Sequence, residues 1–468
     1  MRIQFKTLVV GFIIITLTSL NHHCFSLNKV KTSTIKKRVK GNIYFVSNTG
    51  NDKNPGTKKQ PFKTLKKACS IVKAGDVCYL FGGVYREVLK PKHNGTSKQP
   101  IIFKALEGEE VTISALDQLN NPKFKNNTSI YDLSFNFTTE NFVLCDGEPL
   151  TLARWPNKTN TKLLDPEAAT IVNKGSSPTG IVNFDFPSYF SSKNLKNATV
   201  WANAESKWSC WTSNVVGFDK ENHKVLLKGF GDSWWVNERH NPARAHKHYG
   251  EGIFYIAGAE VLLDAPGEWF FNKKTKQLKL KIPKNKNSKN AVISVNKRAY
   301  SVDFRNRSFI EMDGINLIGA PITFQNASNC TIKNGVVKHF YYSFGKNTTM
   351  GVDHNSGILL AGKNNTISST EIYGSAGSGI LITGTNNQVV NCDIHDVNFL
   401  GSHAGAPISL KGKGHLISHN SIHETGRVCI SMGGGAHTIQ YNHIYNPGRN
   451  SEDLGVIKCG GTDADNIH

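Results

Sequence analysis

The chain lacks several features that mark common classes of protein. No Cys-x-x-Cys pair occurs among its nine cysteines, which argues against a structural zinc site. Beyond the first 20 residues, no apolar run approaches the roughly 20 residues that a membrane-spanning helix needs. Methionine is scarce, at 4 residues, whereas glycine is frequent, at 42. This composition favours a fold rich in strands and turns over a helical one.

The first residues have the form of an export signal. A short basic start is followed by an apolar run from Leu8 to Leu20, and then by small or polar residues that end at Ser26. This run is too short for a membrane span. We therefore predict a signal peptide over 1–26, a basic linker over 27–40, and a secreted protein, either extracellular or periplasmic.

Acidic residues are also few. Lysine and arginine number 56 against 35 aspartates and glutamates, which gives a formal net charge of +21. Removal of Arg2 and Lys6 with the signal leaves +19. A basic surface on an exported protein suggests an anionic partner, such as a uronic-acid or sulfated glycan, although a Lys- and Asn-rich bias explains the charge equally well. The basic residues are dispersed, which argues against nucleic acid as the partner.

The first zone of the mature chain, 41–115, combines strand, turn and helix signals. A strand is expected at Ile43–Val46, and a short amphipathic helix at Pro61–Val72. Export permits disulfides, so Cys69 and Cys78 are candidates to bridge this helix to the strand that follows it.

The second zone, 116–296, contains all seven tryptophans, between Trp155 and Trp269. We predict that it is an inserted β-rich domain. Clustered tryptophans can stack on sugar rings, and the alternative is that they fill the core of this domain as bulky side chains.

A repeat of about two dozen residues dominates the third zone, 297–468. One column of apolar residues is followed five positions later by a second column of β-branched residues, and glycine follows a further strand. The first column is Ile332, Ile367, Val389, Ile417, Ile439 and Ile467, and the second is Val337, Ile372, Ile394, Ile422 and Ile444. Because one coil cannot bury its apolar face alone, the coils must stack with alternate strand residues pointing inward. We therefore predict an all-β solenoid.

The sequence stops at the start of a further coil, at residues 466–468. A solenoid needs a cap at each end. We therefore expect the third zone to be truncated at its C-terminus, with later coils beyond the last residue.

Four stretches resemble a known family. The segments YFVSNTGNDKNPGTKKQPFKTLKKA and AGDVCYLFGGVYRE are similar to the N-terminal cap and first coil of secreted, pectate-lyase-like β-helix proteins. The phrases ARWPN, at 153–157, and LDAPGEW, at 263–269, resemble a β-rich insertion in β-helix glycoside hydrolases of the α-L-fucosidase and xylanase kind. The resemblance implies a right-handed parallel β-helix with an N-terminal cap helix, acting on a polysaccharide.

The coil register predicts which polar residues are neighbours outside the solenoid. Stacked coils lie about 4.8 Å apart, so Asp396 and Glu424 should lie side by side, next to His395 and His423. Carboxyl groups about 5–5.5 Å apart suit a retaining glycosidase, and wider pairs an inverting one. The alternative is a hydrogen-bonded turn ladder without catalytic function. Asn420 and Asn442, at equivalent turns, are expected to form such a ladder.

A longer loop in the last complete coil supplies further candidates, because such loops often shape a substrate cleft. Lys458 follows this loop, on an outward strand position next to Ser431. The catalytic candidates are Asp396, His423, Glu424, Glu452, Asp453 and Lys458, with Asp463 as a further carboxylate. The candidates for substrate binding are Trp234, Trp235, Arg239, His395, His403 and Arg449.

Three functions fit these residues. A glycoside hydrolase would use two of the carboxylates, one as proton donor and one as nucleophile or base. A polysaccharide lyase on a uronate polymer would need Ca²⁺ or arginine to neutralise the uronate, and a basic residue such as Lys411 or Lys458. A non-catalytic adhesin would only bind glycan. We expect a monomer with no metal site, no cofactor apart from Ca²⁺ in the lyase case, and no membrane span.

Overall fold

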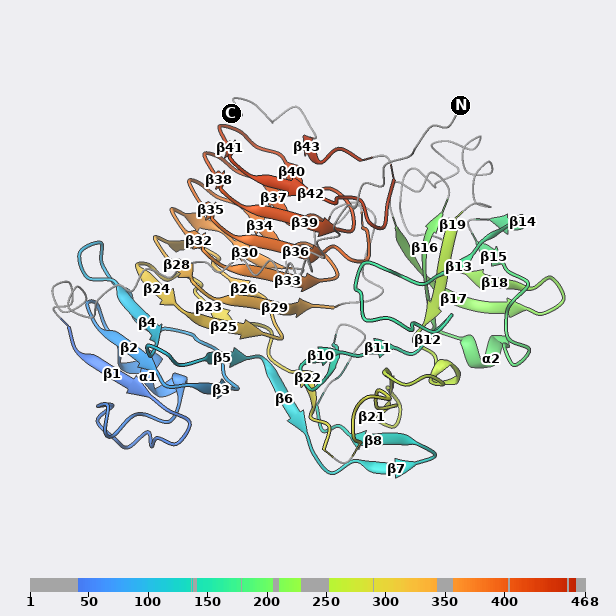
Figure 1. Ribbon diagram of the computed structural model, residues 1–468, viewed down its shortest axis with the longest axis horizontal. Helices are drawn as coiled ribbons and strands as arrows, with labels where there is room; N and C mark the ends of the chain where they lie inside the picture. Colours follow the sequence, from blue (N-terminus) through green and yellow to red (C-terminus); the bar gives the residue numbers. More distant parts are fainter. Residues whose placement is uncertain are drawn as a thin grey trace, which may run out of the picture. The chain divides into compact units, whose positions relative to one another are not determined.

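The computed structural model describes residues 41–459, except 136, 138–140, 178, 205–209, 229–251, 289, 343–356, 403–404 and 453. Three parallel sheets dominate it, and their strands stack in register (Figure 1). The first sheet contains β1 (Ile43–Val46), β2 (Val77–Leu80), β4 (Ile101–Ala105), β24 (Ile310–Asp313), β28 (Thr331–Lys333), β32 (Thr366–Ser368), β35 (Gln388–Val390), β38 (Leu416–Ser418) and β41 (Thr438–Gln440).

The other two sheets complete each coil. The second contains β3 (Gly83–Tyr85), β5 (Val111–Ser114), β25 (Ile315–Ile318), β29 (Val336–Tyr341), β33 (Glu371–Ser375), β36 (Asp393–Val397), β39 (Ser421–Thr425) and β42 (His443–Tyr445). The third contains β23 (Val302–Asp303), β26 (Ile322–Thr323), β30 (Ile358–Leu360), β34 (Ile380–Ile382), β37 (Ile408–Leu410), β40 (Ile430–Met432) and β43 (Ile457–Cys459). A short pair, β27 (Ala327–Ser328) and β31 (Gly362–Lys363), lies at a turn. The predicted parallel β-helix is confirmed.

The apolar columns lie inside the coils. In the first sheet Ile332 pairs with Ile367, which pairs with Val389, and the column continues in register to Ile439. The column also extends backward through Met312, which the repeat pattern did not include. These side chains belong to one continuous core, whereas Ile467 is outside the described residues.

Helix α1 (Leu65–Ile71) is shorter than predicted, because Thr64 caps its N-terminus by accepting a hydrogen bond from the Lys67 amide at 3.1 Å. Its Leu65, Ala68 and Cys69 join the core of the coils. The disulfide expected between Cys69 and Cys78 is wrong, because both are free thiols that fill the core as small side chains. Burial raises the pKa of the Cys69 thiol to about 12.

The segment between β5 and β23 leaves the solenoid and folds into largely antiparallel sheets. The coil nevertheless continues across it, since β24 pairs with β4 and β25 pairs with β5. Its strands are β6 (Leu116–Leu119), β7 (Lys123–Lys125), β8 (Thr128–Asp132), β9 (Val143–Cys145), β10 (Glu148–Pro149), β11 (Thr151–Leu152), β12 (Arg154–Trp155), β13 (Ala169–Thr170), β14 (Val172–Ser177), β15 (Gly180–Val182), β16 (Thr199–Ala204), β17 (Trp211–Asp219), β18 (Lys224–Leu227), β19 (Gly252–Ala257), β20 (Glu268–Asn272), β21 (Gln277–Leu280) and β22 (Ile293–Asn296); its helices are α2 (Ser192–Leu195) and η2 (Glu260–Leu262).

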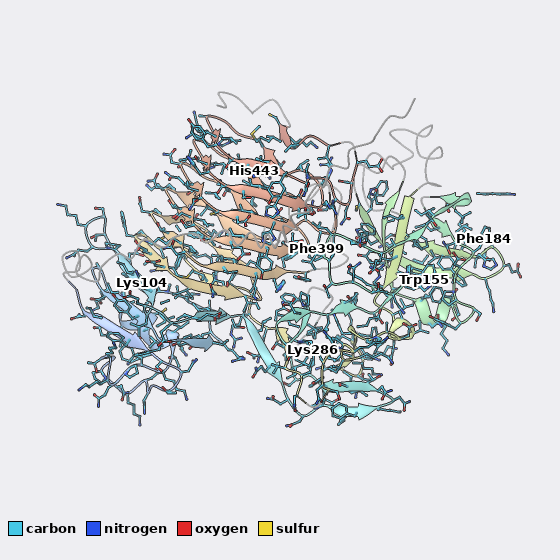
Figure 2. The ribbon with its side chains drawn as sticks, viewed as in Figure 1. Lys104, Trp155, Phe184, Lys286, Phe399 and His443 are labelled. Atoms are coloured by element: carbon cyan, nitrogen blue, oxygen red, sulfur yellow. The ribbon has the colours of Figure 1, made fainter. Side chains whose placement is uncertain are left out.

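The described tryptophans of this inserted segment serve its packing. Trp201, Trp211 and Trp269 are buried, and Trp155 packs against Phe254 with ring centroids 5.9 Å apart. Trp155 lies inside the segment, whereas Phe184 lies at its periphery (Figure 2). For these four tryptophans, core filling is therefore the correct interpretation of the two offered by the sequence.

The two phrases that resemble an enzyme insertion contact each other. The backbone amide of Arg154 donates to Glu268 at 3.1 Å, and Leu152 pairs with Trp269. Burial raises the pKa of Glu268 to about 7. The guanidinium of Arg154 lies 3.8 Å from the centre of the Tyr255 ring. These residues hold the inserted segment together.

Side-chain ladders fix the coil turns. Asn420 accepts from the Cys392 amide at 2.9 Å, and Asn442 accepts from the Asn420 amide at 3.0 Å, which confirms the predicted asparagine ladder. At another turn the ladder changes to histidine, where Nδ1 of His415 accepts from the Asn387 amide at 3.1 Å. Nδ1 of His437 accepts from the His415 amide at 3.2 Å. Neutral histidine therefore replaces asparagine as the acceptor.

Protonation of His415 should weaken this ladder. Burial lowers its pKa below 6.5, so its contribution to stability is present above pH 6.5 and is lost as the pH falls below that value. His415→Leu should lower the free energy of unfolding by about 1–3 kcal/mol, because the Asn387 amide loses its acceptor. His415→Asn keeps an acceptor and should unfold with a weaker pH dependence below 6.5 in urea titrations. Equal pH slopes for His415→Asn and wild type would contradict this assignment.

Within the described residues, no helix is long and apolar enough to cross a membrane.

Candidate active site

A ladder of left-handed residues runs along one edge of the second sheet, where β29, β33, β36, β39 and β42 end. The residues with positive φ are His339 (50°), Gly374 (79°), Asp396 (51°), Glu424 (46°) and Asn446 (48°). Glycine, asparagine, aspartate and histidine tolerate this conformation, whereas glutamate rarely adopts it. Left-handed residues also occur at other turns of the coils, such as Ser369, His419 and Tyr441, so the adjacent carboxylates Asp396 and Glu424 are what make this edge the candidate site.

Four rings stack immediately before this edge, one from each coil. The Tyr373 and His395 rings lie 4.9 Å apart, those of His395 and His423 lie 5.0 Å apart, and those of His423 and Tyr445 lie 4.5 Å apart. The three interplanar angles are 9°, 15° and 6°. The Nε2 atoms of both histidines are directed to the first residue of the preceding strand, Glu371 or Asp393, so the two rings also have the same orientation within their planes.

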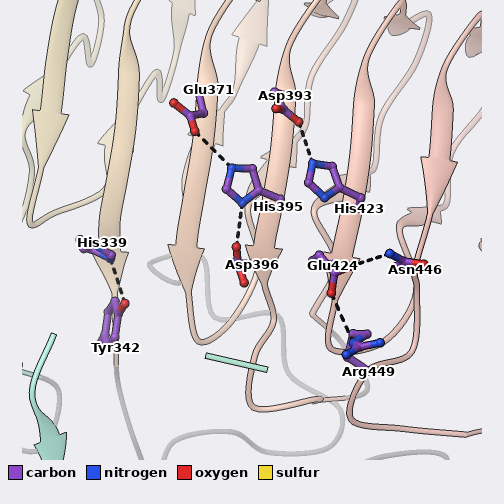
Figure 3. Close-up of polar contacts among 10 residues, drawn as sticks. All are labelled: His339, Tyr342, Glu371, Asp393, His395, Asp396, His423, Glu424, Asn446 and Arg449. Carbon is purple, nitrogen blue, oxygen red and sulfur yellow. Dashed lines mark hydrogen bonds and ion pairs between the residues drawn. The ribbon is translucent and has the colours of Figure 1, made fainter. Parts of the chain in front are cut away.

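His395 is bound by carboxylates on both ring nitrogens (Figure 3). Its Nδ1 lies 2.7 Å from Asp396 Oδ2, and its Nε2 lies 3.3 Å from Glu371 Oε1. Burial opposes a charge on this ring, but the hydrogen bonds to Asp396 and Glu371 outweigh it and raise the pKa of His395 to about 9. The ring is therefore an imidazolium at neutral pH, and its Nδ1 donates a hydrogen bond to Asp396.

This imidazolium should stabilise the fold in a defined pH range. A folded-state pKa of about 9 against 6.5 means that the contribution is complete below pH 6.5 and is lost as the pH rises through 9. After allowance for the exposure of both carboxylates, it is on the order of 1–3 kcal/mol. His395→Gln should therefore be less stable than wild type at pH 6, and the difference should shrink toward pH 10. Chemical denaturation at both pH values measures it, and a constant difference would contradict the assignment.

The two ring nitrogens of His423 have different surroundings from those of His395. Its Nε2 lies 3.0 Å from Asp393 Oδ1, and this hydrogen bond holds the pKa of Asp393 below its usual value. Its Nδ1 is buried and has no hydrogen-bond partner among the described residues. The Asp393 carboxylate accepts a hydrogen bond from Nε2–H of His423. In a neutral His423 the other ring nitrogen, Nδ1, then carries no proton and presents a lone pair.

Two residues of the next coil bind the carboxyl group of Glu424. Asn446 donates its amide to Oε1 at 2.6 Å, and the Nε of Arg449 lies 3.3 Å from Oε2 (Figure 3). Asp396 and Glu424 occupy equivalent positions on paired strands, since His395 pairs with His423 and Val397 pairs with Thr425. The structure therefore brings together Asp396, Glu424, His395 and His423 as the coil register predicts. It also places Arg449, a candidate from the loop of the last coil, against Glu424.

The remaining candidates are placed elsewhere or not described. Glu452 is exposed on the loop after Ser451. Lys458 pairs with Ser431 on the third sheet, as predicted, and is partly buried. Burial and the neighbouring Arg427 lower its pKa. The candidates Trp234, Trp235, Arg239, His403, Asp453 and Asp463 are outside the described residues.

Sequence reasoning missed Glu371 and Asp393, which bind the two histidines. Each stands at the first position of its strand, two residues before the stacked ring of the same strand, so strand alternation puts it on the same face as that ring. Strand alternation combined with the coil register was sufficient to find both. Within the described residues, no three His, Cys, Asp or Glu side chains are grouped to hold a metal ion.

The inserted segment packs against the coil loops that follow this edge. The Trp201 indole donates to the Leu400 carbonyl at 2.9 Å, and the Asn203 amide donates to the Asn450 carbonyl at 2.8 Å. Tyr342 connects the two sides, with its ring centre 4.8 Å from that of Phe142 and 5.1 Å from that of Phe399. The inserted segment therefore lies beside the candidate site.

Residues 313–451 match the family model described as Right handed beta helix region, and residues 48–94 match Protein of unknown function (DUF1565). A curated relative, Uncharacterized protein YwoF of Bacillus subtilis (strain 168), is 43% identical over 74 residues, which are 16% of this chain and 16% of that protein. The matched segment is thus a small part of that relative.

Two solved structures share much of the chain's length. One, named "Glycoside hydrolase", has 14% identity and a TM-score of 0.65, over 90% of this chain and 86% of that one. Another, named "The complex structure of XylC with xylose", has 15% identity and a TM-score of 0.47, over 86% and 62%. The family match and the first structure establish that the solenoid is a right-handed parallel β-helix, as predicted from the resemblance.

Proposed function

We propose that this chain is an extracellular glycoside hydrolase that cleaves a polysaccharide, with Asp396 as nucleophile and Glu424 as general acid and base. The observation that carries the proposal is the placement of two carboxylates on adjacent coils at one strained edge. Coils spaced about 4.8 Å apart suit the closer carboxyl separation of retaining enzymes. A structure of the same fold named a glycoside hydrolase supports this assignment.

The surroundings of the two carboxylates suit different roles. Asp396 accepts a hydrogen bond from the cationic His395, which orients its carboxyl group for attack on the anomeric carbon. Glu424 gives its proton to the leaving oxygen as the ester to Asp396 forms. It then takes a proton from water, whose oxygen attacks the same carbon and releases Asp396.

A polysaccharide lyase is the second candidate, favoured by the Asp393–His423 pair and by Arg449 nearby. Such a pair can supply a base for the α-proton of a uronate, and arginine or Ca²⁺ can neutralise the carboxylate. Against it, Nδ1 of His423 is buried, so a substrate carbon does not reach it without rearrangement.

The deciding experiment incubates the full-length protein with neutral and anionic glycans and follows both reducing ends and ultraviolet absorbance. The proposal expects new reducing ends without absorbance. Unsaturated, absorbing products would instead indicate a lyase, and retention of glycan without any product would indicate a binding protein.

A further inference from the structure

The coils that carry His395 and His423 repeat one arrangement, with a single difference. Each histidine directs Nε2 toward the first residue of the preceding strand, Glu371 for His395 and Asp393 for His423. Each is followed by an acidic residue in the left-handed conformation. The difference is at Nδ1. In His395 this nitrogen also binds the acidic residue that follows, with Asp396 Oδ2 2.7 Å away, whereas Nδ1 of His423 does not bind Glu424.

The second coil has the partner for this contact, but the partner is turned away. The two imidazole planes differ by 15° and both Nε2 atoms are directed to the preceding strand, so Nδ1 of His423 points in the same direction as Nδ1 of His395, toward the following residue (Figure 3). That residue is Glu424, whose side chain is one methylene longer than that of Asp396. Its φ of 46° nearly equals the 51° of Asp396, but its carboxyl is bound by Asn446 and Arg449.

We propose that Glu424 has a second position, in which its carboxyl group binds Nδ1 of His423 instead of Arg449. This inference rests on the proposed function and deepens it, because it makes His423 a positioning residue for the general acid and base. Asp393 acts through His423 by fixing which ring nitrogen carries the proton.

The two positions favour opposite protonation states. Arg449 and Asn446 only donate hydrogen bonds to Glu424, so they stabilise its carboxylate. A neutral His423 that donates a hydrogen bond from Nε2–H to Asp393 has no proton on Nδ1. This nitrogen can only accept a hydrogen bond, so it binds the O–H of the carboxylic acid. A retaining glycosidase needs both states of this residue in each turnover.

The proton balance of the cycle follows from these contacts. Glu424 leaves His423 as it transfers its proton to the leaving oxygen, and Arg449 receives the resulting carboxylate. The attacking water then returns a proton to Glu424, which goes back to His423. The groups around His423 are Asp393 and His395 on β36, Tyr445 on β42, and Glu424 on its own strand, with Arg449 of the loop after β42 bound to Glu424.

The first test is structural and needs no activity. In a crystal structure of Arg449→Met, we expect a Glu424 oxygen within about 3.2 Å of His423 Nδ1. A Glu424 carboxyl that stays away and leaves Nδ1 unpaired would overturn the inference. Nitrogen NMR of the histidines should report His423 with the proton on Nε2 in wild type, and a proton on Nδ1 in neutral His423 would overturn it as well.

The second test is kinetic and uses Asp393→Asn. An asparagine amide can donate to Nε2, which moves the ring proton to Nδ1 and removes the acceptor for the acid form of Glu424. The kcat for a natural glycan should fall at least about tenfold. An aryl glycoside with a very good leaving group needs no proton, so its kcat should stay near the wild-type value. Equal losses on both substrates would overturn the inference.

Glu311→Gln is the matched control, because it removes a carboxylate that pairs with Lys333 on the first sheet, outside this cluster. It should change neither substrate's kcat. If the wild-type protein cleaves no glycan, the proposed function fails, but the position of Glu424 in Arg449→Met still decides the inference. If it cleaves glycans and Glu424 does not move, only the inference fails.

Discussion

Asp396→Asn is expected to lower kcat by about 10³-fold or more, and to lower the free energy of unfolding at neutral pH by no more than the roughly 1–3 kcal/mol that the His395 imidazolium contributes. Asparagine keeps the size of the side chain and a hydrogen bond to His395, but it cannot form the ester with the sugar. The measurement is steady-state hydrolysis of the glycan identified by the substrate screen, with unfolding curves for both proteins.

Two comparisons separate this expectation from general damage. Glu311→Gln, on another sheet of the same solenoid, should keep full activity. In Asp396→Ala, azide can occupy the space of the lost carboxylate and attack the sugar from the same side, so it should restore activity and give a glycosyl azide. Activity of Asp396→Asn within about tenfold of wild type would remove Asp396 from the nucleophile role.

Trp201→Ala is expected to lower the free energy of unfolding by about 3–5 kcal/mol. The side chain is fully buried, stacks on Tyr255 at 5.0 Å and donates to the Leu400 carbonyl. Its loss should therefore loosen the inserted segment against the coil loops. Denaturation followed by circular dichroism measures stability, and hydrogen exchange of the Cys210 amide, bonded to the Gly401 carbonyl at 3.0 Å, reports the contact.

Phe184→Ala is the control in the same segment, because this side chain is 65% exposed. Its effect should lie within about 0.5 kcal/mol. Equal effects of the two substitutions, or unchanged exchange of Cys210 in Trp201→Ala, would mean that the contact does not hold the segment in place.

The solenoid was predictable because its determinants are local and repeated. Isoleucine and valine at fixed intervals fix both the inward face and the register, and the register then gives the neighbours of Asp396 and Glu424. The same logic reaches Glu371 and Asp393, since both stand two residues before a stacked ring. These pairs depend on strand period and coil length alone.

Other features were not predictable because they depend on long-range packing. The coil repeat carries no signal that Leu381 and Ser409, at outward strand positions, are only 2% and 4% exposed, or that Lys458 at the end of the same column is partly buried. Nor does it indicate that Arg449 reaches Glu424 and leaves His423 unpaired at Nδ1, because a loop conformation decides this. The pairing of Arg154 with Glu268 joins residues more than 100 positions apart.

The continuity of the coil across the inserted segment has a consequence for folding. Ile101 and Ile310 are neighbours on adjacent strands although about 200 residues separate them, whereas Ile367 and Val389 are separated by one ordinary coil. Closing the longer loop costs about 2 kcal/mol more in chain entropy than closing one coil. The pairing of Leu116 with Asn296 draws the two ends of the segment together. A solenoid interrupted in this way should therefore zip fastest from the coils after β24, with the junction at β4 joining last.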